Sequence, residues 1–119
     1  MANILVVDDE KDVVELLKFL LEKDGYVVAT AHNGREALES TGKNVPDLIL
    51  LDVMMPEMDG YTVQTRLLDN PATREIPIII LTAKGQLRDV FAMSPNVKAY
   101  IEKPFDPKTL RNKIKESLQ

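Results

Sequence analysis

The sequence predicts an α/β fold built on a doubly wound, five-stranded parallel sheet. Runs that are apolar on every side, such as residues 48–51, are typical of strands buried on both faces, as in parallel sheets. Segments with apolar residues at helical spacing alternate with these runs, which implies right-handed crossovers and helices on both faces. The chain has 119 residues, enough for one such domain.

The first half of the chain supplies three strands and two helices. The first strand ends on Asp8-Asp9, and Gly25 ends the helix that follows. Asn33 can cap the second helix, with Glu36 three residues later completing a capping box. The second strand is less apolar than the others, which suits a sheet edge. The expected elements are strands at 3–7, 26–31 and 48–52, and helices at 13–21 and 34–41.

The second half repeats the alternation. Turn residues, including Pro56, show that the third strand stops near Asp52. A proline at position 95 cuts the fourth helix short. Asp106-Pro107 reads as a cap followed by a first-turn proline. The expected elements are helices at 60–70, 86–93 and 107–118, and strands at 77–81 and 97–101.

Five residues that can carry chemistry follow predicted strands: Asp8, Asp9, Asp52, Thr82 and Lys103. Parallel strands place their carboxyl ends on one edge, and ligands bind there in open α/β sheets. In strand order 2-1-3-4-5 the first and third strands are neighbours, so three carboxylates converge. Because like charges repel, a cation is needed to offset them. A hard divalent cation such as Mg²⁺ suits an all-oxygen site, and Lys103 adds a fixed positive charge.

Each residue also has a plainer interpretation. Asp9 can cap the first helix, and Asp52 can simply begin a loop. Thr82 is a β-branched residue suited to a strand, and a lone Lys103 would normally be a solvated surface charge. What favours a functional site is the joint placement of all five residues at one expected edge.

Four segments in order resemble the signature segments of bacterial response-regulator receiver domains of the two-component systems: VDDE at 7–10, LDVMMPEMDG at 51–60, LTAK at 81–84 and KPF at 103–105. The resemblance covers nearly the whole chain. It implies a CheY-like, flavodoxin-like (βα)5 three-layer sandwich and one receiver domain over residues 1–119. It also implies a switch that is activated by phosphorylation. Such a protein is not an enzyme that turns over a separate substrate.

The resemblance implies a phosphoacceptor and a metal site. Asp52 would accept a phosphoryl group from a sensor histidine kinase or a phosphotransfer protein. Mg²⁺ or Mn²⁺ would be held by Asp8, Asp9, Asp52 and the backbone carbonyl of Met54. In-line phosphoryl transfer needs positioning and charge neutralisation more than covalent help, which fits this residue set.

The resemblance also assigns the surroundings of the phosphoryl group. Lys103 and Thr82 would each bind a phosphoryl oxygen, and the small Ala83 would leave room for the group. Thr82 and Tyr100 would move together as the switch, and Lys103–Pro104 would be a cis peptide bond.

The composition narrows the partners and the compartment. A net charge of −4 disfavours direct nucleic-acid binding. No membrane-length apolar run or signal peptide is seen, and cysteine is absent, which is compatible with a reducing cytosol. The chain is therefore expected to be cytoplasmic and not bound to a membrane. Met1 and the lack of a trailing linker favour a stand-alone receiver over a fragment of a larger transcription factor or hybrid kinase.

The expected output surface is the face formed by 86–93, 97–101 and the last helix. In DNA-binding receivers this face carries matched charges that form a symmetric dimer, but Lys98-Ala99 stands here before Tyr100. An isologous dimer needs each charge to meet its opposite. We therefore expect a monomer whose face docks a downstream effector protein.

Three other classes fit less well. An aspartyl-phosphate phosphatase of the haloacid-dehalogenase type would need a second Asp where Met54 stands. A nucleotide-binding module would need a Gly-rich loop after the first strand, where Asp8-Asp9 stands instead. A degenerate receiver used only for protein binding would not need the full set of charged residues.

Overall fold

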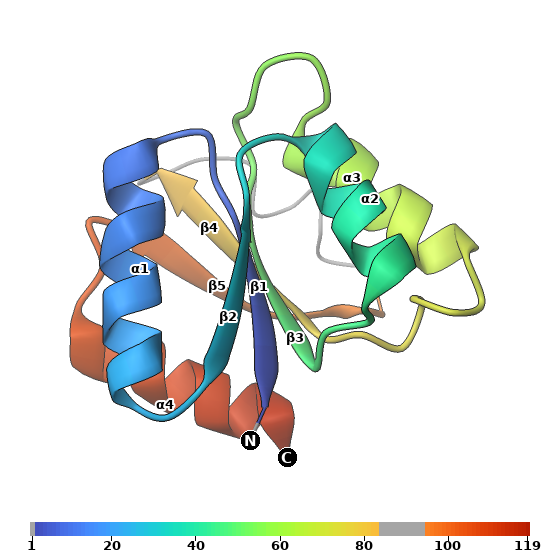
Figure 1. Cartoon of the computed structure of the whole chain (residues 1–119). Helices are drawn as coiled ribbons and strands as arrows, with labels where there is room; N and C mark the ends of the chain where they lie inside the picture. Colours follow the sequence, from blue (N-terminus) through green and yellow to red (C-terminus); the bar gives the residue numbers. More distant parts are fainter. Residues whose placement is uncertain (1, 84–94) are drawn as a thin grey trace.

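The computed structural model describes residues 2–83 and 95–119 (Figure 1). Five parallel strands form one sheet in the order β2-β1-β3-β4-β5, which confirms the predicted topology. The helix expected at 86–93 lies outside the described residues. The strands are β1 (Asn3–Val7), β2 (Val27–Ala31), β3 (Leu48–Asp52), β4 (Ile78–Ala83) and β5 (Val97–Lys103).

Helices cover both faces of the sheet and form the outer layers of a three-layer sandwich. Two of them, α1 (Lys11–Lys23) and α4 (Pro107–Leu118), lie on one face. The other two, α2 (Gly34–Lys43) and α3 (Gly60–Asp69), lie on the opposite face (Figure 1). Each face has its own core of buried apolar side chains, here called the α1–α4 core and the α2–α3 core. This is the doubly wound arrangement that the alternating pattern predicts.

Burial explains the strand order. Every residue of β3 is buried, as its uninterrupted apolar run predicts for a central strand. In β2, four of the five residues are exposed or half-buried, which fits its place at the edge. The least apolar of the predicted strands is thus an edge strand, which has a neighbouring strand on one side only.

Side-chain caps fix where helices begin. The Oδ1 of Asn33 accepts a hydrogen bond from the Glu36 N–H at 2.8 Å, as predicted. The Glu36 carboxylate accepts from the backbone N–H of His32 at 2.8 Å, one residue earlier than a standard capping box requires. This backbone hydrogen bond holds the pKa of Glu36 below its ordinary value. Asp106 caps α4 by accepting from the N–H of Thr109 at 3.1 Å.

Two strands run further than their apolar residues predict. β4 continues to Ala83 and β5 to Lys103, and these two residues are paired in the sheet register. The backbone ladder therefore extends past the apolar runs to the edge where the functional residues gather.

Candidate functional site

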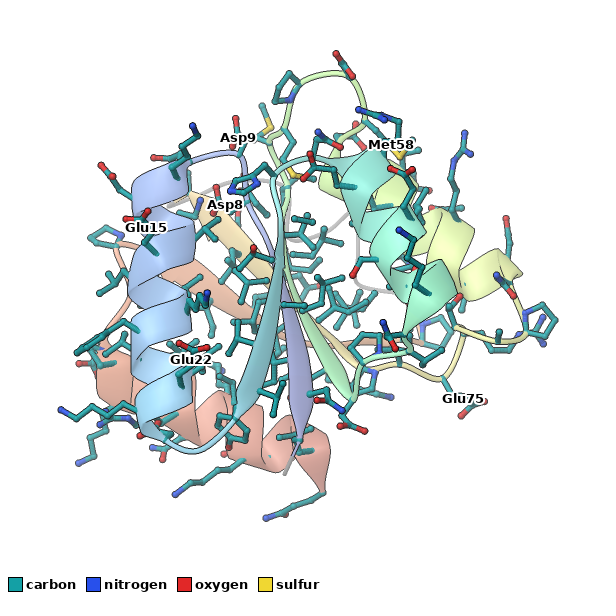
Figure 2. All side chains as sticks on the ribbon, in the orientation of Figure 1. Asp8, Asp9, Glu15, Glu22, Met58 and Glu75 are labelled. Carbon is teal, nitrogen blue, oxygen red and sulfur yellow. The ribbon has the colours of Figure 1, made fainter. Side chains whose placement is uncertain are left out.

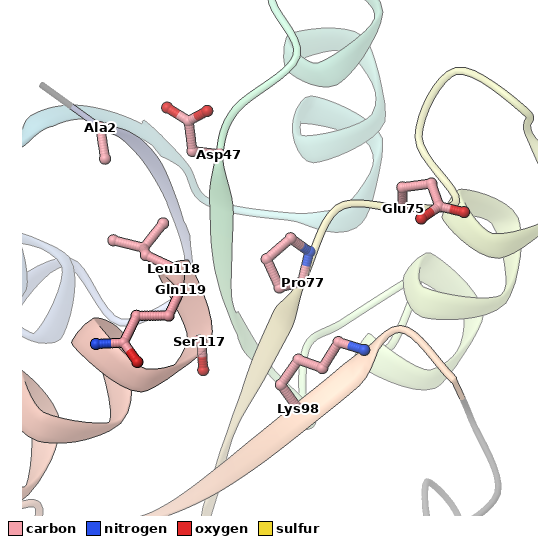
Figure 3. Close-up of a pocket in the computed structure, with 8 residues that line it drawn as sticks. All are labelled: Ala2, Asp47, Glu75, Pro77, Lys98, Ser117, Leu118 and Gln119. Carbon is pink, nitrogen blue, oxygen red and sulfur yellow. The ribbon is translucent and has the colours of Figure 1, made fainter.

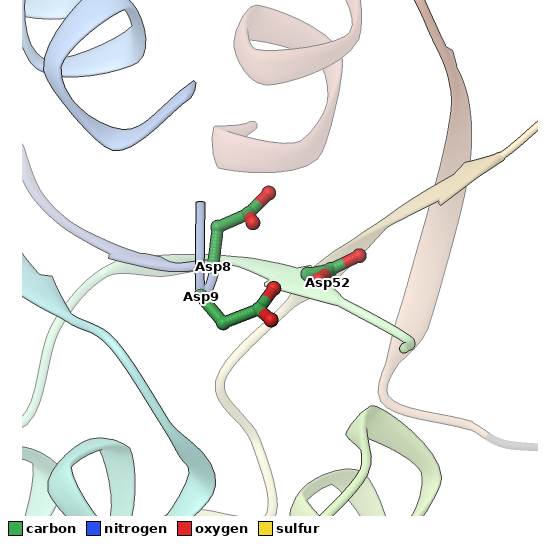
Figure 4. A group of neighbouring side chains, drawn as sticks. All are labelled: Asp8, Asp9 and Asp52. Carbon is green, nitrogen blue, oxygen red and sulfur yellow. The ribbon is translucent and has the colours of Figure 1, made fainter. Parts of the chain in front are cut away.

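Three aspartates meet at the carboxyl edge of the sheet. Asp8 follows β1, Asp9 is next in the chain, and Asp52 ends β3, which is the neighbour of β1. One carboxylate oxygen from each lies within 4.8 Å of the others, and Figure 4 shows the three groups around a common space. Asp8 and Asp52 are buried, whereas Asp9 is exposed. The structure thus brings together three of the residues selected from the sequence.

Lys103 supplies the positive charge in this cluster. Its Nζ lies 2.7 Å from an oxygen of Asp8 and 3.3 Å from one of Asp52. Because β4 separates β3 from β5 in the sheet, the Lys103 side chain reaches across β4 to make the second contact. Glu10 also lies 3.5 Å from Nζ, a contact that sequence reasoning missed. Its place directly after Asp8-Asp9 is the one feature that could have indicated it.

Burial and charge alter the proton affinities of the site. Loss of hydration, together with the neighbouring Asp8 charge, raises the pKa of Asp52 from 3.8 to about 7, even though Lys103 opposes the change. Burial by itself would lower the pKa of Lys103. The hydrogen bond to Asp8 and the charge of Asp52 outweigh that effect and raise it. Without a further cation, Asp52 is therefore only partly ionised at neutral pH.

The turn after β1 is organised by Asp8. Its Oδ1 accepts from the backbone N–H of Glu10 at 2.9 Å, while its Oδ2 contacts Lys103. The N-cap residue of α1 is Glu10, which makes no side-chain capping hydrogen bond. The plainer interpretation of Asp9 as a helix cap is therefore wrong. Figure 2 places Asp8 and Asp9 at the turn that leads into α1.

The loop between β3 and α3 folds back against Asp52. The backbone N–H of Gly60 donates to the carbonyl of Val53 at 2.8 Å. A Cβ at position 60 would collide with the backbone oxygen of Asp52, so only glycine allows this approach. Glu57 adopts a positive φ of 69° within the loop. Met54 is the second residue after Asp52 in this loop and is 57% exposed, whereas its neighbours Val53 and Met55 are buried.

The remaining sequence-selected residues lie on β4 and β5. Thr82 is buried, one position beyond the partner of Asp52 in the sheet register, and its hydroxyl donates to the carbonyl of Ala83 at 3.1 Å. Tyr100 is half-buried and packs against the α2–α3 core. The peptide bond between Lys103 and Pro104 is cis.

A cavity of about 530 Å³ lies at the opposite, amino edge of the sheet (Figure 3). Its walls come from residues that precede strands, such as Asp47 and Pro77, and from the end of α4. The aspartate cluster and this cavity are therefore separated by the length of the strands. Among the helices in the described part of the chain, none is long and apolar enough to cross a bilayer.

Comparisons with known proteins agree with this geometry. The sequence model of the response regulator receiver domain family matches residues 4–115. The response regulator SaeR of Staphylococcus epidermidis is 40% identical over 111 residues, which are 92% of this chain and 47% of SaeR. The chain thus spans about half or less of the length of the curated relatives it matches.

Two solved receiver structures have the same fold over nearly their whole length. The chemotaxis response regulator CheY4 of Vibrio cholerae has a TM-score of 0.92 at 31% identity, covering 99% of each chain. The response regulator TrrA of Thermotoga maritima, solved in complex with Mg²⁺-BeF, has a TM-score of 0.88 at 37% identity. This match covers 99% of the present chain and 100% of TrrA.

Proposed function

This chain belongs to the response regulator receiver domain family, and we propose that residues 1–119 form one receiver domain with Asp52 as its phosphoacceptor. Members of this family are phosphorylation-activated switches of two-component signalling. The observation that carries the assignment is the contact of Lys103 Nζ with both Asp8 and Asp52 beside a third carboxylate. Asp52 is the aspartate of this cluster that ends a central strand, and the Lys103 ammonium group lies 3.3 Å from it.

The donor set fits a hard divalent cation, Mg²⁺ or Mn²⁺. Three carboxylates lie within 4.8 Å of one another, and Lys103 cannot neutralise all of them. Such a cation prefers oxygen ligands, which Asp8, Asp9, Asp52 and the Met54 carbonyl would supply. When bound, it supplies charge neutralisation for the carboxylates and for the incoming phosphoryl oxygens.

The chain's own residues account for the transfer. An ionised Asp52 oxygen attacks phosphorus, forming an O–P bond while the bond from phosphorus to the donor's nitrogen or oxygen breaks. Lys103, already 3.3 Å from Asp52, can pair with a phosphoryl oxygen without crossing the site. The Thr82 hydroxyl would exchange its contact with the Ala83 carbonyl for another phosphoryl oxygen.

That exchange links the site to a surface. Tyr100 of β5 pairs with Ile80, two residues before Thr82 on β4, so the Thr82 and Tyr100 side chains point to the same face of the sheet. A shift of the Thr82 hydroxyl would then allow the aromatic ring to change its position. Such a local movement biases a two-state surface. A hollow of about 290 Å³ lies beside the end of β5 and the start of α4, and its lining includes Tyr100, Phe105 and Lys113. We assign it to docking of a downstream effector protein, with a sensor histidine kinase or phosphotransfer protein as the donor.

With this function, the chain is a cytoplasmic phosphoacceptor. It supports its own phosphorylation and slow dephosphorylation, and it does not turn over another substrate.

We also propose that it is a monomer in both the unphosphorylated and the phosphorylated state. Lys98 donates to the carbonyl of Pro95 at 3.0 Å, within its own chain. Sedimentation with and without beryllofluoride tests this, since a dimer that forms with the mimic and is lost on changing Lys98 would contradict it. A receiver belonging to a longer regulator is the alternative, favoured by the length of SaeR.

The phosphoacceptor is tested by intact mass after treatment with acetyl phosphate and Mg²⁺. Wild type is expected to gain one phosphoryl group, and Asp52→Asn none. Asp69→Asn changes an exposed carboxylate at the end of α3 and serves as the matched control, which should label like wild type. Equal labelling of Asp52→Asn would show that another residue accepts the group.

A further inference from the structure

Two buried amide side chains outside the aspartate site bind each other. Gln64 of α3 is 1% exposed, and Asn96, which precedes β5, is 3% exposed. The Nε2 of Gln64 donates to the Oδ1 of Asn96 at 2.8 Å, and the Asn96 Nδ2 donates to the Gln64 carbonyl at 3.5 Å. The Asn96 carbonyl accepts from the backbone N–H of Ile78 at 2.8 Å. Because buried polar groups are costly without partners, these bonds fix the start of β5 against α3 and β4.

Directly after this anchor, β5 contains a bulge. Val97 pairs with Ile78, but Ala99 pairs with Ile79, so Lys98 is an extra residue on β5. The Lys98 side chain turns back to the carbonyl of Pro95. The anchor and the bulge are therefore adjacent features of one short segment.

The two cores show what the bulge does. Val97 and Tyr100 pack against the α2–α3 core, whereas Ala99 packs against the α1–α4 core. In a regular strand, residues two apart point to the same face. Val97 and Ala99 point to opposite faces because Lys98 is accommodated in the bulge. The bulge therefore sets the face to which every later residue of β5 points.

Lys103 depends on this register. With the bulge, Lys103 is opposite Ala83. If β5 paired regularly from Val97 onward, each later residue would move one position, and Glu102 would be opposite Ala83. A carboxylate would then take the place of the ammonium group beside three aspartates.

We infer that Gln64 and Asn96 are positioning residues for Lys103. Their buried amide pair holds the start of β5, keeps Lys98 in the bulge, and so places Lys103 instead of Glu102 at the carboxylates. The effect on phosphorylation rests on the proposed role of Lys103, whereas the effect on the strand register does not.

The test compares Gln64→Leu with Thr73→Val at a temperature where both proteins are folded. Thr73 is the matched control because it is a similarly buried polar residue, 3% exposed, whose hydroxyl donates to the Leu67 carbonyl at 2.7 Å and not to a residue of β5. The readouts are nuclear Overhauser contacts between β4 and β5 and the rate of labelling by acetyl phosphate with Mg²⁺. Gln64→Leu is expected to populate the shifted register and to label at least about tenfold more slowly, because small displacements at a reacting centre are costly. Thr73→Val should keep the native β4–β5 register and the wild-type rate of labelling.

Deleting Lys98 should rescue Gln64→Leu if that variant acts by shifting the register of β5. It would not rescue a variant that had only lost stability in general. Without this residue, β5 pairs regularly while Ala99 stays opposite Ile79 and Lys103 opposite Ala83. The deletion combined with Gln64→Leu should therefore restore both the register and the labelling rate.

Several outcomes would overturn the inference. A native register in Gln64→Leu with labelling equal to that of Thr73→Val is one, and failure of the Lys98 deletion to restore either readout is another. If Gln64→Leu does not fold, Gln64→Met, which keeps the side-chain length without the hydrogen bond, takes its place under the same criteria. If wild type itself is not labelled, the proposed function fails, and the Overhauser contacts alone decide the positioning role.

Discussion

Replacing Asp52 by Asn should stabilise the metal-free protein at alkaline pH. Asp52 is buried and lies beside Asp8, and its pKa rises from 3.8 to about 7. A raised pKa means that the folded protein holds a proton that the unfolded chain releases. Asparagine has nearly the same shape and no charge, so it removes the cost of ionising this buried group.

The magnitude follows from proton linkage. Between about pH 4 and pH 7 the folded state binds more protons at this position, so the free energy of unfolding falls as the pH rises. The difference between a pKa of 3.8 and one of about 7 corresponds to ~4 kcal/mol at pH values above 7. Solvent screening of the Asp52 carboxylate reduces this value. Asn cannot reproduce the Lys103 ion pair, which makes ~4 kcal/mol an upper bound.

Urea unfolding in EDTA at pH 5 and at pH 8.5 measures the effect. The stability advantage of Asp52→Asn over wild type should grow between the two pH values, while exposed Asp12→Asn should show no such growth. Saturating Mg²⁺ should reduce the advantage, because the cation binds the ionised site of wild type more tightly. An advantage that is equal at both pH values would refute the assignment of the pKa to Asp52.

Three further results are expected. Mg²⁺ should raise the melting temperature of wild type, and this increase should shrink in Asp9→Ala; no increase at any Mg²⁺ concentration up to tens of millimolar would count against the metal site. Lys103→Ala, phosphorylated to the same extent as wild type, should bind its effector more weakly, and equal binding would contradict its role in the switch. Gly60→Ala should cost ~1–3 kcal/mol of stability, because its Cβ would lie 2.8 Å from the Val53 Cα. Unchanged chemical denaturation of that variant would show that the loop can move.

The sheet and its functional edge could be predicted because both follow from local patterns. A run buried on both faces requires a central strand, and the handedness of crossovers leaves few strand orders. The residue that ends such a strand, Asp52, then lies at the edge without any knowledge of side-chain packing. Asp8 and Lys103 lie at the same edge, as their places after β1 and at the end of β5 predict, although they are 95 residues apart in the chain.

Contacts between side chains on different elements could not be predicted in this way. Gln64 and Asn96 are 32 residues apart, and neither shows a pattern that would identify the other. The bulge at Lys98 could not be predicted from the sequence either, because residues 97–101 have the pattern of a regular strand. The pKa of Asp52 depends on the burial of its carboxylate, which composition and spacing do not determine.

The site therefore combines buried carboxylates, whose ionisation is costly, with the Lys103 ammonium group, which the fold must place accurately. In the described part of the chain, the ammonium that contacts Asp8 and Asp52 is that of Lys103, and it also lies near Glu10. A fourth carboxylate so close shows that the lysine is shared and not saturated by one partner. A transferred phosphoryl group would add negative charge where this lysine already lies, so its pairing can change without a large movement. The accuracy of that placement comes from strand register, and the register depends on polar residues at the far end of β5.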